Sequence, residues 1–136
     1  MMAAVDLLRR VLVIQAVVWA ACGAVIAVAP RFVLVTMFDL APIPDTGYVR
    51  IAGVFSFSLS LLMVLVARRL EQLWWFAWAF VLAAVGSAVV AALNAAFGLP
   101  DGASPLLWWL FAAASAAFTV GLLAGLAKTG TERPPL

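Results

Sequence analysis

Four long apolar runs separated by short polar stretches are the feature that most limits what this chain can fold into. An α-helix rises about 1.5 Å per residue, so runs of about 20 residues match the roughly 30 Å hydrocarbon thickness of a bilayer. The sequence is 68% hydrophobic and 10% charged, whereas about a quarter of the residues in soluble domains are charged. We therefore predict an all-α integral membrane protein, a four-transmembrane-helix antiparallel bundle forming a single membrane domain over residues 1–136. The expected helices are residues 11–29, 46–69, 73–97 and 106–127, with an outer connector over residues 30–45.

A cleaved signal peptide is the alternative interpretation of the first run, because Ala27-Val28-Ala29 imitates a cleavage site. The run is longer than the apolar core of a signal peptide, which has about 7–15 residues, and Pro30 directly follows the imitated site. We therefore expect a retained helix. The apolar segment 32–38 is too short to cross a bilayer, so we expect it to lie in the interface or under the rim of the bundle.

The basic residues predict how the chain is threaded. Four spans place both termini on one side of the membrane, and a cytoplasmic assignment gives six basic residues inside and two outside, which is the positive-inside pattern. The inside set is Arg9, Arg10, Arg68, Arg69, Lys128 and Arg133, and the outside set is Arg31 and Arg50. The Ala-, Val- and Arg-rich, Lys-poor composition suggests a bacterium. We therefore predict a multi-pass protein of the bacterial cytoplasmic (inner) membrane with both termini in the cytoplasm.

Several chemistries lack the residues that they need. The chain has no His, which is the commonest metal ligand and general base, and its single Cys excludes an internal disulfide. No phosphate-binding loop, dinucleotide fingerprint or metal-ligand spacing occurs. We therefore expect that the protein is not an enzyme and that it has neither a catalytic residue nor a metal site. The only cofactor that we expect is a bound lipid or quinone. The net charge of +2 is too small and too scattered for nucleic acid.

Arg50 stands closest to an apolar segment among the basic residues, and Asn94 approaches the same outer face from the third run. Together with Tyr48 and Asp101 they could form an outer-leaflet pocket for a lipid phosphate, a carboxylate or a quinone carbonyl. The structural alternative is that Arg50 snorkels to the surface or pairs with an acidic residue to hold the connector; the acidic candidates are Asp39, Asp45 and Asp101.

Small residues are the expected packing positions, because helices in lipid associate through close contact and a few hydrogen bonds. The fourth run carries a small residue at every fourth position: Ala113, Ala117, Gly121 and Gly125. Other candidates are Gly53, Ser56, Ser60 and Ser87. These residues serve either packing within the bundle or, most plausibly for the fourth run, contact with another polypeptide. Gln15 is expected to cap a neighbouring helix or to meet headgroups.

A family resemblance supports the same fold. The first run ends at Pro30, the connector leads into Tyr48-Val49-Arg50-Ile51-Ala52-Gly53, a short turn follows at 68–72, and the third run bears Asn94. In these features the chain resembles small bacterial four-helix membrane proteins of the DoxX-like, largely uncharacterised kind. The resemblance implies a four-helix bundle and nothing about activity.

Two functional hypotheses follow, and a third is less favoured. The first is a non-catalytic accessory or scaffold subunit that packs against a larger membrane complex, and the second is a protein that binds a lipid, a quinone or another small molecule. A small homo-oligomeric transporter is disfavoured because no Asp, Glu or Lys lies within the spans. The expected partners are membrane lipids and other membrane subunits or a second copy of the chain.

Overall fold

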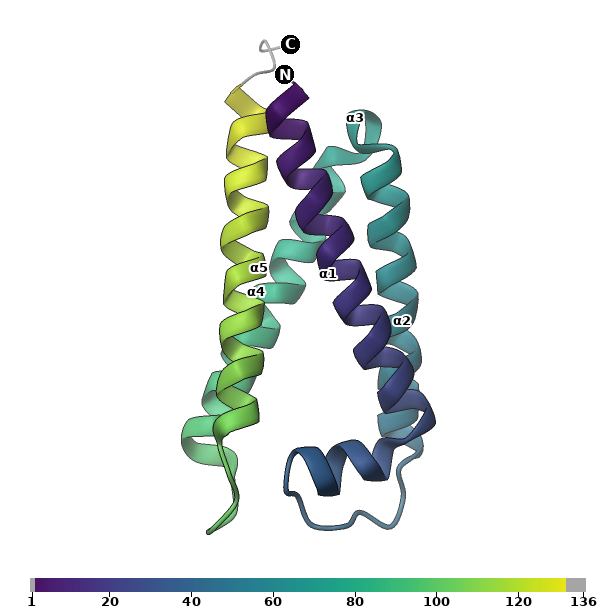
Figure 1. The fold of residues 1–136 in the computed structure, drawn as a ribbon, viewed down its shortest axis with the longest axis vertical. Helices are drawn as coiled ribbons and strands as arrows, with labels where there is room; N and C mark the ends of the chain where they lie inside the picture. Colours follow the sequence, from purple (N-terminus) through teal and green to yellow (C-terminus); the bar gives the residue numbers. More distant parts are fainter. Residues whose placement is uncertain (1, 132–136) are drawn as a thin grey trace.

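The structure, a computed structural model, describes residues 2–131 and contains only helices and their connections in that range (Figure 1). The elements are α1 (Met2–Val28), the π-helix η1 (Phe32–Met37), α2 (Gly47–Arg68), α3 (Leu70–Leu73), the 3-10 helix η2 (Trp74–Phe76), α4 (Ala77–Leu93), the π-helix η3 (Asn94–Gly98) and α5 (Leu106–Thr131). Four helical segments are long and apolar enough to cross a membrane: Asp6–Val28, Gly47–Arg68, Leu70–Gly98 and Leu106–Thr129. The prediction of an all-α chain with four such helices is confirmed.

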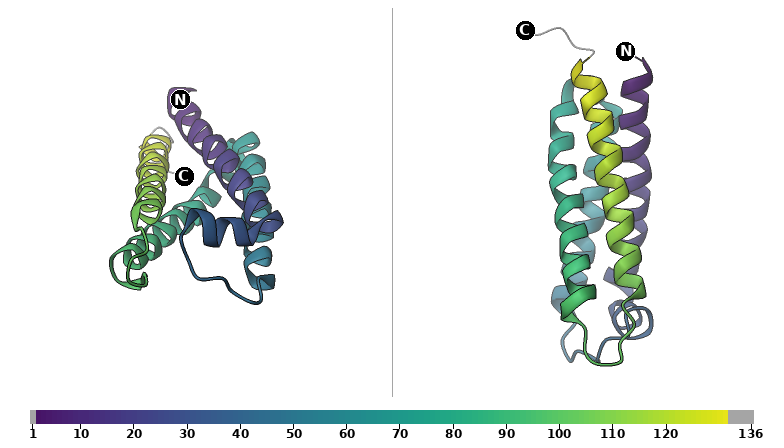
Figure 2. Two further views of the ribbon diagram at one scale, coloured as in Figure 1. Left: turned by 60° about the horizontal axis from the view of Figure 1, so that its bottom comes forward. Right: turned by 90° about the vertical axis from the view of Figure 1, so that its left-hand side faces the viewer.

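The four long segments run up and down, so that α1 begins and α5 ends at the same end of the molecule (Figures 1 and 2). We call this the terminal end, and the opposite end, where η1 lies, the connector end. The most extensive helix contact is between α1 and α2, followed by that between α4 and α5. The contact between α1 and α5 joins these two pairs.

The short turn at 68–72 suggests a tight antiparallel hairpin of the second and third spans, but these spans do not pack closely along their length. The connection is short, but α2 and α4 touch at few positions and diverge toward the connector end (Figure 1). The backbone leaves helical geometry at Arg69 (φ −118°, ψ 37°) and again at Leu73 (φ −115°, ψ 12°). These two bends turn α4 away from α2. The expected single helix over 73–97 is therefore a succession of 3-10, α and π segments.

The hydrophobic core lies at the terminal end. Its cluster takes residues from α1 only as far as Ala16 and from α5 only from Leu122 onward. The members are Leu8, Leu12, Ala16, Met63, Val66, Ala67, Leu70, Ala77, Phe80, Val81, Leu122 and Leu126. The halves of the helices nearer the connector end are therefore held by other contacts.

One of these contacts is a close crossing of α1 and α2 at two glycines. A Cβ atom on Gly53 would lie 2.5 Å from the Ala27 nitrogen and 2.7 Å from the Gly23 oxygen. Both neighbours are backbone atoms, so only a residue without a side chain fits. This is the small-residue packing typical of membrane helices, and its second member, Gly23, was not among the residues that we expected from the sequence.

Local polar side chains fix where two helices begin. Asp45 Oδ1 accepts a hydrogen bond of 2.8 Å from the Gly47 nitrogen at the start of α2. Ser104 Oγ accepts one of 3.4 Å from the Leu106 nitrogen at the start of α5. Both satisfy a backbone N–H group that has no partner within its helix.

Candidate functional site

The outer-face pocket expected from Tyr48, Arg50, Asn94 and Asp101 is not formed. Tyr48, Arg50 and Asp101 are exposed, Asn94 is half-buried, and their side chains make no hydrogen bond or ion pair within residues 2–131. The first turn of α2 and the π-helix η3 lie on opposite sides of the connector end (Figures 1 and 2). The expectation assumed a compact bundle, whereas the divergence of α2 and α4 separates these segments.

The structural alternatives for these residues are only partly met. Arg50 forms no ion pair with Asp39, Asp45 or Asp101 within residues 2–131, and its exposure fits a side chain that snorkels. The amide of Asn94 folds over Gly98 within the same helical turn, because a Cβ atom on Gly98 would collide with Asn94 Oδ1.

The small-residue stripe of α5 is divided between two surroundings. A Cβ atom on Gly125 would meet Leu8 at 2.9 Å, and one on Gly121 would meet Val11 at 3.2 Å, so this part of the stripe packs against α1. Ala113 and Ala117 are exposed. The stripe is thus used within the chain near the terminal end and is uncovered near the connector end.

Two of the three serines among the expected packing residues bond to their own helix. Ser56 Oγ donates to the Ala52 oxygen at 2.9 Å, and Ser60 Oγ donates to the Phe57 oxygen at 2.6 Å. Ser60 is buried, whereas Ser87 and Ser56 border a cavity. Hydroxyls on membrane helices commonly bond in this way.

Three adjoining cavities lie between α1, α4 and α5 on the side of the core toward the connector end. Their volumes are about 410, 240 and 170 Å³. Phe111 borders all three, Trp19 borders the first and third, and Cys22 borders the second and third. Because they share these wall residues, the three cavities adjoin one another, and we call them together the lateral cleft.

The π-helix η1 forms the floor of the lateral cleft. It lies across the connector end, between the α1–α2 pair and the α4–α5 pair (Figures 1 and 2). Val33 is buried, and Val33, Met37 and Phe38 border the 240 Å³ cavity. The rings of Phe38 and Trp108 are 4.7 Å apart at 56°, so the connector also contacts α5. The segment 32–38 thus lies at the rim of the helices as a short π-helix.

The wall of the lateral cleft is apolar, with a few neutral polar groups. The described residues that border it include no charged side chain. Ser115 is buried beside the 170 Å³ cavity, and Trp108, which borders the 410 Å³ cavity, has a buried Nε1–H group with no hydrogen-bond partner in the described residues. Because this N–H group is covered by protein atoms, a ligand in the cleft would meet mainly apolar side chains.

The described residues that border the lateral cleft include few groups of the kind used in acid–base or metal chemistry. Its one ionisable group is the thiol of Cys22. No group of three His, Cys, Asp or Glu residues suited to a metal ion occurs within the part of the chain that the structure describes. The arrangement is suited to binding.

Similarity to known proteins does not indicate what the lateral cleft binds. No family model, no curated protein and no solved structure matches this chain. The resemblance to DoxX-like proteins therefore stays a prediction.

Proposed function

We propose that this chain is a multi-pass membrane protein that holds the apolar chain of a membrane amphiphile, a lipid or a quinone, in the lateral cleft. The observation that carries the proposal is the cleft itself, which α1, α4, α5 and η1 enclose with apolar side chains. Small-molecule sites are typically concave and mostly apolar, with volumes of roughly 300–1,000 Å³ and a few polar groups that orient the ligand. The serines that border the 170 Å³ cavity, Ser56, Ser87 and Ser115, supply such groups.

The physical reason is the cost of empty apolar space. Side chains that border a void lose dispersion contacts on one side. Within a bilayer the surrounding medium is hydrocarbon, so an apolar chain restores these contacts without desolvation of a charge.

The accessory-subunit hypothesis rests on a weaker observation. Exposed Val, Leu and Phe side chains are expected on any membrane helix that faces lipid, so they do not indicate a protein partner. Only Ala113 and Ala117 of the α5 stripe remain uncovered, since Gly121 and Gly125 pack against α1. This short exposed stripe is where a neighbouring subunit would pack closely.

Two neighbouring alanines separate these functions. Ala113 and Ala114 are both exposed on α5, but only Ala114 borders the lateral cleft. We expect Ala114→Phe to reduce the co-purifying amphiphile by about tenfold or more, because overfilling a site costs about 1–3 kcal/mol. The measurement is lipid and quinone mass spectrometry of protein purified in mild detergent, with Ala113→Phe as the matched control.

The control also tests the accessory role. Unchanged amphiphile in Ala114→Phe would contradict the proposed function. Loss of a stoichiometric foreign protein from Ala113→Phe, with the amphiphile retained in both variants, would support the accessory subunit instead.

We also propose that the terminal end faces the cytoplasm of a bacterial inner membrane. The support is the excess of basic residues at that end, where five of the described ones lie against two at the connector end; the sixth expected residue, Arg133, lies outside the described residues. We expect alkaline phosphatase fused after Asp101 to be active and a fluorescent protein fused at the C-terminus to fluoresce. An inactive phosphatase after Asp101, or a C-terminal fluorescent protein that does not fluoresce, would contradict this threading.

A further inference from the structure

A second concavity lies at the terminal end, away from the lateral cleft. Its volume is about 350 Å³, and it shares no bordering residue with the cleft. The residues around it are Arg9, Arg68, Arg69, Leu70, Glu71 and Gln72. Three arginine residues therefore border one small space, against a single acidic residue.

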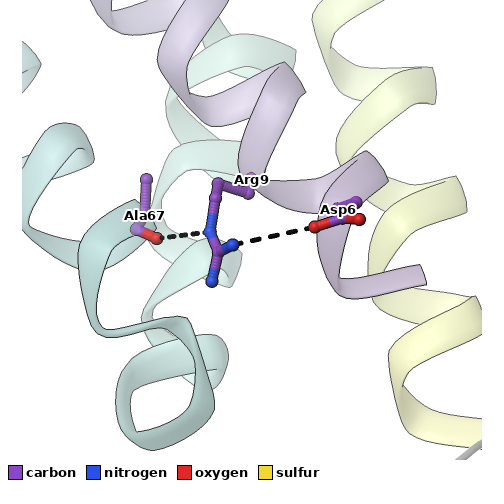
Figure 3. Close-up of polar contacts among 3 residues, drawn as sticks. All are labelled: Asp6, Arg9 and Ala67. Atoms are coloured by element: carbon purple, nitrogen blue, oxygen red, sulfur yellow. Dashed lines mark hydrogen bonds and ion pairs between the residues drawn. The ribbon is translucent and has the colours of Figure 1, made fainter. Parts of the chain in front are cut away.

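Arg9 is held in place by contacts from two helices. Its Nε donates a hydrogen bond of 3.1 Å to the Ala67 oxygen on α2, and its Nη1 lies 3.7 Å from Asp6 Oδ1 on α1 (Figure 3). The ion pair is long and about half-exposed, so it contributes little. A guanidinium has five N–H donors, so Arg9 keeps donors for a further acceptor while its position is fixed.

Arg68 and Arg69 lack partners of their own. Both are exposed, and their side chains make no hydrogen bond or ion pair in the region from residue 2 to residue 131. Neighbouring like charges repel one another, and this repulsion falls when an anion lies between them. The concavity is thus suited to an anion that several arginines can contact at once.

The place of this concavity on the helices indicates which anion is available there. Arg68 ends the apolar span Gly47–Arg68, and the next turns of the chain bring Trp74 and Trp75. Tryptophan and terminal arginines are typical of the layer where lipid headgroups lie. Phosphate oxygens in that layer match the forked donors of arginine.

We propose that Arg9, Arg68 and Arg69 form a binding site for the phosphate of an anionic phospholipid. Basic pockets between membrane helices on the cytoplasmic side are known to take such headgroups. This site is independent of the amphiphile in the lateral cleft, because it recognises charge at the terminal end and the cleft recognises an apolar chain.

The test is a lipid competition on the intact chain. The full-length protein in detergent is given phosphatidylglycerol and phosphatidylcholine in equal amounts, and bound lipid is counted by native mass spectrometry. We expect a preference for phosphatidylglycerol that falls roughly thirtyfold in Arg68→Gln/Arg69→Gln, since each basic residue contributes on the order of fivefold. The matched control is Arg31→Gln/Arg50→Gln, which removes two exposed arginines near the connector end and should keep the preference.

The other outcomes of the lipid competition also decide whether the site exists. Equal binding of the two lipids by the unchanged protein, or an equal loss in both double variants, would overturn the site. Displacement of phosphatidylglycerol by millimolar inorganic phosphate would show a soluble anion as the ligand and would also overturn it. If Arg68→Gln/Arg69→Gln does not fold, Arg68→Gln and Arg69→Gln are measured singly. A loss of roughly fivefold in each would support the proposal, and a full preference in both would overturn it.

Discussion

Replacing Gly53 by Ala is expected to destabilise the folded chain by about 1–3 kcal/mol, the range found for overfilled cores. The added methyl would lie 2.5 Å from the Ala27 nitrogen and 2.7 Å from the Gly23 oxygen. Both are backbone atoms, so no side chain can rotate away and α1 must move from α2. The measurement is the thermal midpoint of the purified protein in mild detergent. It is monitored by the loss of helical circular-dichroism signal or of the monomer peak in size-exclusion chromatography.

Gly86 provides the matched control. It also lies inside a helix, but no neighbouring atom would lie within 4 Å of a Cβ added at this position. Because Ala favours a helix over Gly by about 1 kcal/mol, Gly86→Ala should leave the midpoint unchanged or raise it. Equal effects of the two substitutions would show that the crossing does not determine stability. Gly23→Ala should act at the same crossing, so its effect should not add to that of Gly53→Ala.

The glycines also explain why the lateral cleft exists. Near the terminal end α1 packs against α5 at Gly121 and Gly125, and near the connector end it packs against α2 at Gly53. The helix therefore runs obliquely from one partner to the other (Figure 1). As α1 leaves α5 a space opens between them, and η1 and side chains such as Phe111 border it. Because α1 packs closely against α5 at the terminal end and against α2 at the connector end, α1 and α5 are separated toward the connector end, where the lateral cleft lies.

Local features of the fold could be predicted from the sequence because they depend on neighbouring residues. The lengths of the apolar runs predicted four helices long enough to span a membrane, which the structure contains. Asp45 and Ser104 are residue types that favour a helix start, and their oxygens accept backbone hydrogen bonds at the starts of α2 and α5. Helix ends of this kind are encoded within a few residues. The sequence therefore sufficed for the number of long apolar helices and for the starts of α2 and α5, whereas α1 begins at Met2 rather than at residue 11.

The packing of the helices could not be predicted in the same way, because it depends on which face of each helix contacts its neighbour. A helix that is apolar all round carries no pattern to show its buried side, and α4 and α5 are of this kind. The association of Arg50 with Asn94 assumed that the second and third spans pack together, and the bends at Arg69 and Leu73 prevent this. Gly23, four residues before Ala27, was a small-residue signal that could have been found.

Gln15 is the polar residue whose surroundings differ most from the expectation. The sequence suggested a cap on a neighbouring helix or a contact with headgroups, but the side chain is fully buried. Neither its Oε1 nor its Nε2 has a hydrogen-bond partner in the described part of the chain. It lies three residues after the core residue Leu12 and three before Val18, which borders the lateral cleft. An amide held in apolar surroundings in this way lowers stability.

We therefore expect Gln15→Leu to stabilise the chain, by about 1–3 kcal/mol, because it removes two unpaired polar atoms at similar volume. The check is a rise in the thermal midpoint in mild detergent. Ser60→Ala is the control, since this buried hydroxyl already donates to the Phe57 oxygen at 2.6 Å, and its removal should bring no gain. A lower midpoint in Gln15→Leu would show that the amide contributes a hydrogen bond to the folded state. Retention of the amphiphile should be unchanged, because Gln15 is fully buried and does not border the lateral cleft.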